Sequence, residues 1–160
     1  MDKSQYGRRD RLVQEKRHDT YKEGKKWPEP TTCIKCDSVY IEGRWTWFDP
    51  PAGANKITCP ACQRIDDNYP AGHLELNGSF FKNHHEEMIN LIRNEEKQEI
   101  GEHPLERIIE INEEDEHTLI TTTGIHIARR IGEAISHAYQ GDLSFTYGDG
   151  EKTIRVSWSR

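Results

Sequence analysis

The 160-residue sequence lacks any apolar run of about 18 residues, the length that a membrane-spanning helix requires. It also lacks a hydrophobic stretch near its first residue, so we expect a cytoplasmic protein with reduced cysteines and no membrane contact. Apolar residues make up 33% of the chain and charged residues 31%. That apolar share is lean for one domain, so we expect part of the chain to be metal-held or disordered.

The motifs of common catalytic sites are missing as well. The sequence contains no glycine-rich phosphate loop, no G-x-S-x-G and no H-E-x-x-H pattern. Asp66 and Asp67 resemble paired acid–base carboxylates, but no nucleophile accompanies them, and aspartate favours turns and surfaces. His84 and His85 are adjacent and therefore point in different directions, which does not suit a metal pair. We predict that the chain is not an enzyme and takes no small-molecule substrate.

Cysteine is scarce, and all of it falls into two C-x-x-C pairs separated by 22 residues. Each pair places two thiolates on one tight turn, and two such turns supply the four sulfurs of a closed tetrahedral zinc site. Iron is the minority alternative, because four thiolates also suit iron. Two disulfides or a redox pair are less favoured, since the sequence shows neither a signal peptide nor a βαβ context. The predicted ligands are Cys33, Cys36, Cys59 and Cys62.

Charge is distributed unevenly within a net charge of −6. Residues 1–26 carry nine Lys or Arg against five Asp or Glu, a charge of +4, whereas residues 27–160 carry 13 against 23, a charge of −10. We predict that residues 1–30 form a flexible arm, because they have too few apolar side chains to offset the entropy of ordering. This arm is either a phosphate-binding element, densest at Arg8, Arg9 and Arg11, or a solvated tail without a specific role.

Residues 31–76 follow the order of a zinc ribbon: a knuckle, a hairpin, a loop and a second knuckle. Strands are expected at 39–41 and 44–48 around a turn at 42–43, and 49–53 is expected to be a loop. Because this segment has little core of its own, we expect it to lose its fold without zinc.

The ribbon also carries an aromatic run and scattered basic residues. Trp45, Trp47 and Phe48, with Arg44 and Lys56, are able to stack on bases and pair with phosphates. Lys35 and Arg64 add positive charge around the knuckles, which is a modest indication of RNA contact. The favoured alternative is that Trp45 and Trp47 cover the small ribbon or dock it on the next domain.

Residues 77–160 show the periodicities of an α+β domain in the order α-β-β-α-β-β. Helical spacing predicts helices over 80–99 and from a Thr123 cap to about Tyr139, and strand patterns predict hairpins over 105–123 and 142–158. We expect an antiparallel sheet of about four strands with helices on one face, and an open polar face. Alternation assigns Leu143, Phe145, Tyr147, Ile154, Val156 and Trp158 to the core side.

The start of the second helix is a candidate phosphate site. Hydroxyls of Thr122 and Thr123, the helix N–H groups and the guanidiniums of Arg129 and Arg130 are groups that hold phosphate. The alternative is an exposed helix start whose arginines pair with Glu133.

Several stretches resemble a known family. Cys33-x-x-Cys36 followed by Trp45, together with the segment 59–65, resembles the zinc ribbon of the Nmd-type adaptor for ribosomal large-subunit export. The segments 103–108 and 120–132 are more similar to a prokaryotic family that carries the same ribbon. The resemblance implies zinc bound by the four cysteines, and contact with the ribosome or structured RNA. Adaptors of that family have a further cysteine set, where this sequence has a basic arm, so export is not implied.

We therefore expect a non-catalytic, zinc-binding protein associated with RNA or the ribosome. The alternative is a protein–protein adaptor that does not contact RNA directly. Its acidic stretch, with 12 Asp or Glu against three Lys or Arg over residues 86–116, would meet a basic protein partner.

Overall fold

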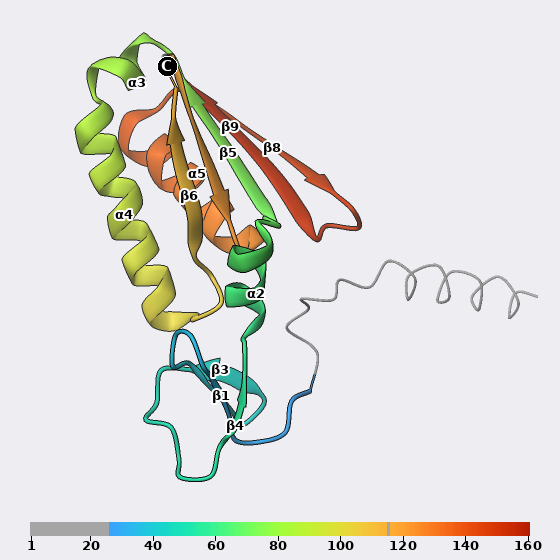
Figure 1. Cartoon of the computed structure of the whole chain (residues 1–160). Coiled ribbons are helices and arrows are strands. Elements are labelled where there is room, and N and C mark those ends of the chain that lie inside the picture. The colour runs from blue at the N-terminus through green and yellow to red at the C-terminus, as the bar shows by residue number, and fades with distance from the viewer. Residues whose placement is uncertain (1–25, 115) are drawn as a thin grey trace, which may run out of the picture.

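The computed structural model describes residues 26–114 and 116–160. A small four-stranded sheet lies at one end of the molecule, and a larger sheet covered by helices makes up the rest (Figure 1). The predicted combination of α-helices and β-sheets is confirmed, with helices placed between groups of strands along the chain.

The small sheet has the strand order β3-β2-β1-β4. Its hairpin forms where the sequence predicts it, because Glu42 and Gly43 both adopt the positive φ that a tight two-residue turn requires. The first strand pairs in parallel with the fourth, which joins the two knuckle segments side by side. The bounds are β1 (Thr31–Cys33), β2 (Val39–Ile41), β3 (Arg44–Thr46) and β4 (Asn55–Ile57).

Helix α2 (Pro60–Asp67) leads from the second knuckle toward the larger sheet, a helix that the pattern analysis did not include. Its signals are in the sequence: Pro60 stands at the first helical position, and Asn68 ends the helix in the left-handed conformation. Asp66 and Asp67 lie in its last turn, consistent with the expected surface role.

The larger sheet corrects two expectations. It has five strands in the order β6-β7-β5-β9-β8, not about four, and it is mixed, because the central pair β5·β9 is parallel. The central strand β5 begins at Gly72, before the boundary expected at residue 76, so the larger sheet includes residues that were assigned to the ribbon segment. The bounds are β5 (Gly72–Asn77), β6 (Ile108–Glu113), β7 (His117–Thr122), β8 (Asp142–Gly148) and β9 (Thr153–Ser159).

Three helices accompany this sheet: α3 (Ser79–Asn83), α4 (His85–Glu102) and α5 (Ile125–Tyr139). The helix predicted over 80–99 is present but interrupted at His84, and it continues past Gly101. Thr123 does not cap α5, because Gly124 occupies the cap position without a side-chain bond. Met88 and Ile92 of α4 and Ile131 and Ile135 of α5 are fully buried in one core.

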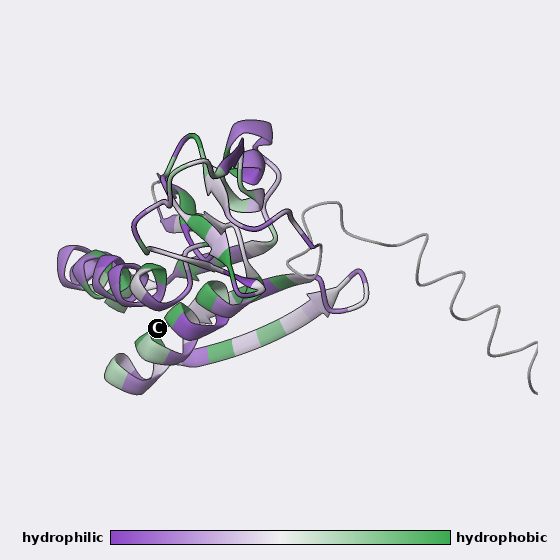
Figure 2. Cartoon of the chain, turned by 90° about the horizontal axis from the view of Figure 1, so that it is seen from below, coloured by the Kyte–Doolittle hydropathy of each residue, from purple (hydrophilic) through white to green (hydrophobic). Residues whose placement is uncertain are grey.

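The strands of the larger sheet alternate in hydropathy, as the green and pale bands along the foremost strand of Figure 2 illustrate. Ile154, Val156 and Trp158 are buried as predicted, and Leu143 and Phe145 pack at the edge of the core. Tyr147 is the exception, with 39% of its surface exposed, because it lies at the tip of the β8–β9 hairpin. The core therefore lies on the helix side of the sheet.

Candidate metal centre and the adjoining pocket

The structure brings the four predicted cysteines together. Their sulfur atoms all lie within 4.8 Å of one another, and no other cluster of metal-binding side chains occurs in the described part of the chain. Cys33 ends β1 and Cys36 lies in the turn that follows, while Cys59 caps α2 and Cys62 lies in its first turn. Three of the four are buried, and Cys36 is half-buried.

Backbone N–H groups orient the sulfurs in both knuckles. The N–H of Lys35 donates to Cys33 Sγ at 3.4 Å, and the N–H of Cys62 donates to Cys59 Sγ at the same distance. A third bond, from Cys59 N–H to Cys33 Sγ at 3.3 Å, connects the two knuckles. These bonds reach one sulfur in each knuckle, Cys33 and Cys59, and help to fix the positions of both within the cluster.

The sulfur atoms of Cys36 and Cys59 lie within hydrogen-bonding distance of each other. Their Sγ atoms are 3.8 Å apart, and this contact lowers the pKa of Cys36 to about 3, helped by a hydrogen bond with Ser38. The same contact raises the pKa of Cys59, and burial raises that of Cys62. A metal ion bound here requires thiolate ligands, so its binding would release protons from the cluster.

The donor set fits zinc. Four sulfurs on two facing turns are typical of closed structural zinc sites, and they leave no position for a water or substrate. The same set also suits iron, so the residues define a four-thiolate site and do not by themselves select the metal.

Sequence analysis missed Arg107, which lies against this cluster. Its Nη1 donates to Cys62 Sγ at 3.2 Å, and its Nη2 donates to Cys36 Sγ at 3.0 Å and to Cys59 Sγ at 3.6 Å. Burial opposes the charge of the guanidinium, yet the neighbouring Cys59 and Cys36 raise its pKa above the ordinary arginine value. Arg107 lies within the segment 103–108 that resembles the prokaryotic family, but nothing in that segment indicates a contact with cysteines at least 45 residues earlier in the chain.

The aromatic run divides into buried and exposed members. Trp45 is 7% exposed and packs between Trp27 and Tyr40, so it supports the ribbon. Trp47 is 40% exposed and donates its Nε1–H to Ile100 O at 2.6 Å, which joins the ribbon to the end of α4. Trp45 thus covers the ribbon core and Trp47 docks the ribbon on the next domain, as the favoured interpretation of the sequence expected.

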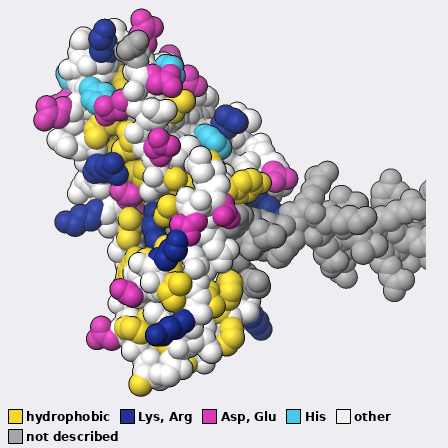
Figure 3. Space-filling model, viewed as in Figure 1, with side chains coloured by type: hydrophobic (Ala, Val, Ile, Leu, Met, Phe, Trp, Pro, Cys, Tyr) yellow, Lys and Arg dark blue, Asp and Glu magenta, His cyan; other side chains and the backbone are white. Residues whose placement is uncertain are grey.

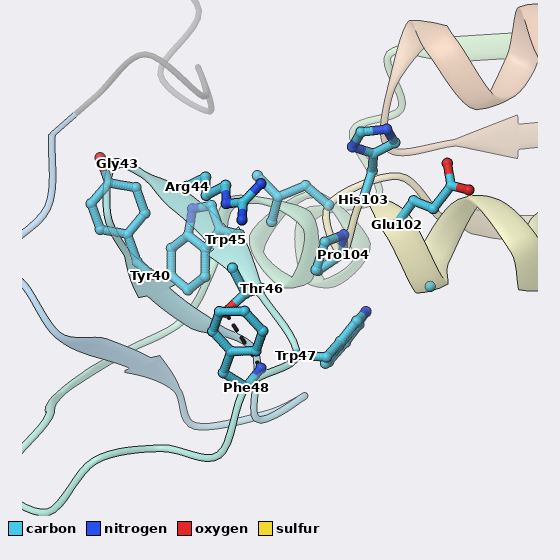
Figure 4. A pocket seen from close by; sticks show the side chains of 12 residues that line it. Tyr40, Gly43, Arg44, Trp45, Thr46, Trp47, Phe48, Glu102, His103 and Pro104 are labelled. Carbon is cyan, nitrogen blue, oxygen red and sulfur yellow. Dashed lines mark hydrogen bonds between the residues drawn. The ribbon is translucent and has the colours of Figure 1, made fainter.

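A pocket of about 630 Å³ lies where the ribbon meets the end of α4. Figure 4 shows that its labelled side chains come from β2, β3 and the residues after β3 on one side, and from the segment Glu102–Pro104 on the other. Phe48 is 59% exposed, and the neighbouring Arg44 is exposed as well. The pocket thus combines aromatic surfaces with one guanidinium.

Arg64, a predicted RNA contact, is not at the surface. It is 6% exposed, donates from Nη1 to Tyr69 O at 3.0 Å and lies near the face of the Tyr69 ring. Its position in α2 directs it into the protein, so its charge serves the local structure. Lys35 on the first knuckle pairs with Asp66 of α2.

The threonines predicted to hold a phosphate have partners within the chain. Thr122 is fully buried and donates to Gly124 O, and Thr123 donates to Leu105 O at 2.5 Å. The start of α5 is also occupied, because the N–H of Ile127 donates to the buried Glu106 carboxylate at 3.1 Å.

Both arginines of that group lie in ion pairs. Arg130 bonds Glu95 at 2.7 Å and Glu99 at 2.5 Å, and Arg129 bonds Glu133 at 2.9 Å. Both guanidiniums are therefore paired with carboxylates of the protein, and phosphate binding at this site stays a prediction.

The densest basic group, Arg8, Arg9 and Arg11, lies outside the described residues. Lys26 is the first residue that the structure describes, and Trp27 packs against the ribbon core. The expected role of the arm stays a prediction.

Comparisons with protein-family models, curated proteins and solved structures give no match to this chain. The resemblance to ribosomal export adaptors therefore stays a prediction that rests on the residues named above. Among the described residues, no helix combines the length and the apolar character that crossing a bilayer would need. The structure itself establishes four cysteine sulfurs clustered closely enough to bind one metal ion.

Proposed function

We infer that this chain is a non-catalytic zinc protein that binds RNA, with the ribosome or another structured RNA as its partner. Zinc has a structural role in this proposal, because a four-thiolate shell is closed and offers no open coordination position. Cys33, Cys36, Cys59 and Cys62 would hold the ion, and the ion would hold the ribbon in its fold.

The observation that carries the RNA proposal is the pocket beside the ribbon. Proteins bind unpaired bases by stacking them on exposed aromatic rings, while nearby guanidiniums pair with phosphates. Phe48 and Trp47 offer exposed rings at this pocket, and Arg44 supplies the charge. Its volume of about 630 Å³ lies within the range of small-ligand sites, which is ample for one base.

The difference in surface character between the two ends of the molecule supports the ribbon end. Figure 3 shows hydrophobic side chains exposed over the ribbon at the lower end, while acidic and histidine side chains gather toward the upper end. RNA, a polyanion, would meet the ribbon and the basic arm and avoid the acidic end.

The adaptor alternative has fewer free acidic side chains available for a partner than the sequence suggests. Several acids of the 86–116 stretch are engaged within the protein: Glu95 and Glu99 bind Arg130, and Glu96 accepts from Ile108 N–H at 2.8 Å. Only the acidic side chains that are not engaged within the protein would be available to a basic protein partner. We therefore rank the adaptor function second, and the experiment below distinguishes the two functions.

The test uses the full zinc-loaded chain and a fluorescent single-stranded RNA of mixed sequence, with binding measured by anisotropy across a salt series. We expect Phe48→Ala to weaken binding by about 5- to 150-fold, which corresponds to the ~1–3 kcal/mol of one stacked base. Tyr147→Ala is the matched control, because Tyr147 is an exposed aromatic on the other sheet and should leave binding unchanged.

The arm is tested in the same assay and in lysate. Replacing Arg8, Arg9 and Arg11 together by Ala should reduce the slope of log K against log salt by about 2, since each lost phosphate contact on a single strand removes about 0.7. Wild-type chain should also sediment with a ribosomal subunit until nuclease is added. A partner retained after nuclease, with no salt-dependent RNA binding, would overturn the RNA proposal in favour of the adaptor.

A further inference from the structure

One guanidinium connects the sulfur cluster to the rest of the molecule. Arg107 belongs to the segment between α4 and β6, yet its two terminal nitrogens donate to Cys36, Cys59 and Cys62. Three of the four candidate metal ligands are therefore bonded by a residue that lies outside the ribbon. A positive charge at this position also offsets part of the net charge of −2 that four thiolates and one Zn²⁺ would carry.

The larger domain fixes the position of this side chain. Arg107 Nε donates to Pro104 O at 2.7 Å, and its backbone N–H donates to Thr123 Oγ1 at 2.8 Å. Thr123 N–H returns a bond to Arg107 O at 2.8 Å, so the end of β7 holds the arginine from both sides. The guanidinium is thus pre-positioned, and little freedom remains to be lost when it meets the sulfurs.

Two further contacts lie beside it. Leu105 is 8% exposed and packs in the ribbon core, although it belongs to the same α4–β6 connection. Trp47 bonds Ile100 O, and the Arg107 guanidinium lies 5.8 Å from the centre of its ring. The contact between ribbon and domain therefore includes Arg107 and the sulfur cluster. The pocket lies beside it, with Trp47 on its ribbon side and the segment from Glu102 to Pro104 on the other (Figure 4).

We propose that Arg107 makes metal binding and docking of the ribbon a single coupled event. With the metal bound, the sulfurs stay clustered and present three acceptors to the guanidinium, which fastens the ribbon to the domain. Without the metal, the two knuckles are joined only by weaker contacts such as the bond from Cys59 N–H to Cys33 Sγ, so the sulfurs spread, the guanidinium loses acceptors, and the ribbon leaves the end of α4. The pocket then loses one of its two walls. This coupling rests on the zinc site of the proposed function and is independent of RNA binding.

Two indole N–H groups report docking and folding separately. Trp47 Nε1 donates across the contact to Ile100, whereas Trp158 Nε1 donates to Gln140 O at 2.6 Å inside the larger domain. Their proton exchange is measured by ¹⁵N NMR, with the signals assigned through W47F and W158F. Zinc affinity of the same samples is measured by competition with a chromophoric chelator.

We expect Arg107→Met, which keeps an apolar stem and removes the donors, to weaken zinc binding about 10- to 100-fold, as loss of outer-shell partners does. At saturating zinc this variant should lose protection at Trp47 and keep it at Trp158. Arg107→Lys keeps the positive charge but loses the two-pronged guanidinium, so its zinc affinity and Trp47 protection should lie between those of wild type and Arg107→Met. This variant also keeps the proposal testable if Arg107→Met fails to fold. Arg93→Met, the same change at an exposed site of α4, should match wild type.

The outcomes separate the two proposals. A wild-type chain that binds no zinc overturns the zinc site and the coupling together. A wild type that binds one zinc, with Arg107→Met and Arg107→Lys matching it in zinc affinity and Trp47 protection, overturns the coupling alone and leaves the zinc proposal standing.

Discussion

The ribbon and the larger domain are stabilised by different means. Seven buried residues form the ribbon core, and three of them are cysteines of the candidate metal site, so little apolar surface remains once the sulfurs are set aside. The larger domain buries 14 residues in one cluster, nearly all aliphatic or aromatic. We therefore predict that the domain folds through apolar burial alone, and that the ribbon, whose four sulfurs could hold a metal ion, depends on that ion for its fold.

The contact between the two regions differs again, because it is mainly polar. Arg107 donates to sulfur and Trp47 donates to a helix-terminal carbonyl, while Leu105 is the one residue of the larger domain in the ribbon core cluster. Directional hydrogen bonds fix an orientation, but they contribute less net stability than apolar burial does. We therefore expect docking to depend on the state of the sulfurs, and folding of the larger domain to be independent of it.

The largest expected effect follows removal of one metal ligand. Cys59→Ser takes away a buried sulfur that belongs to the cluster and also caps α2. Structural zinc contributes roughly 10–16 kcal/mol of apparent binding free energy to small zinc modules, so we expect the ribbon to unfold. Hydrogen exchange should show lost protection in β1–β4 and retained protection in β5–β9.

Chelation of zinc from the wild-type chain is the matched control, since it removes the metal without changing the sequence. It should reproduce the exchange pattern of Cys59→Ser. Global loss of protection in both samples would contradict the comparison, because it would show that the larger domain also needs the metal.

The converse change targets the larger core. Ile131 of α5 is fully buried, so Ile131→Ala removes apolar contacts and leaves a cavity. We expect the free energy of unfolding of this domain to fall by about 2–5 kcal/mol in urea denaturation, with one zinc still bound per chain. Ile34→Ala is the control, because Ile34 is 60% exposed on the ribbon and should change stability little.

Local signals account for what was predicted correctly. The C-x-x-C pairs define their turns within four residues, the Glu42–Gly43 pair defines a hairpin, and the spacing of Ile127, Ile131 and Ile135 defines α5. Each of these features depends on neighbours in the sequence, and each appears in the structure. The sequence also predicted that the two distant cysteine pairs lie together, because a closed metal site requires four ligands.

Long-range pairings account for what was missed or wrong. The parallel pair β5·β9 joins residues 72–77 to residues 154–159, and neither strand carries a mark of its partner. Arg107 meets the sulfurs only after α4 and β6 are placed, and Glu106 takes the start of α5 where Thr123 was expected to act. Propensity and periodicity describe single elements, so they contain no information about such contacts.

The smallest expected effect distinguishes two adjacent arginines of α5. Both were predicted to bind phosphate, yet Arg130 is bonded to Glu95 and to Glu99, whose side chain is only 8% exposed. Arg130→Ala would leave the Glu99 carboxylate buried without its cation, which costs more than loss of an exposed pair. We expect the larger domain to lose about 1–2 kcal/mol of unfolding free energy, a value reduced from the fully buried case because Arg130 is 32% exposed.

Arg129→Ala is the matched control one residue away, because its pair with Glu133 is exposed on both sides. It should leave the denaturation midpoint close to wild type, and zinc content should be the same in both variants. Equal destabilisation by the two changes would contradict the assignment of Arg130 to the α4–α5 contact. A loss of RNA binding by Arg130→Ala without loss of stability would restore the phosphate interpretation. The larger domain would then contribute directly to RNA binding, which we propose for the ribbon. This pair of variants therefore also tests whether RNA binding is confined to the ribbon.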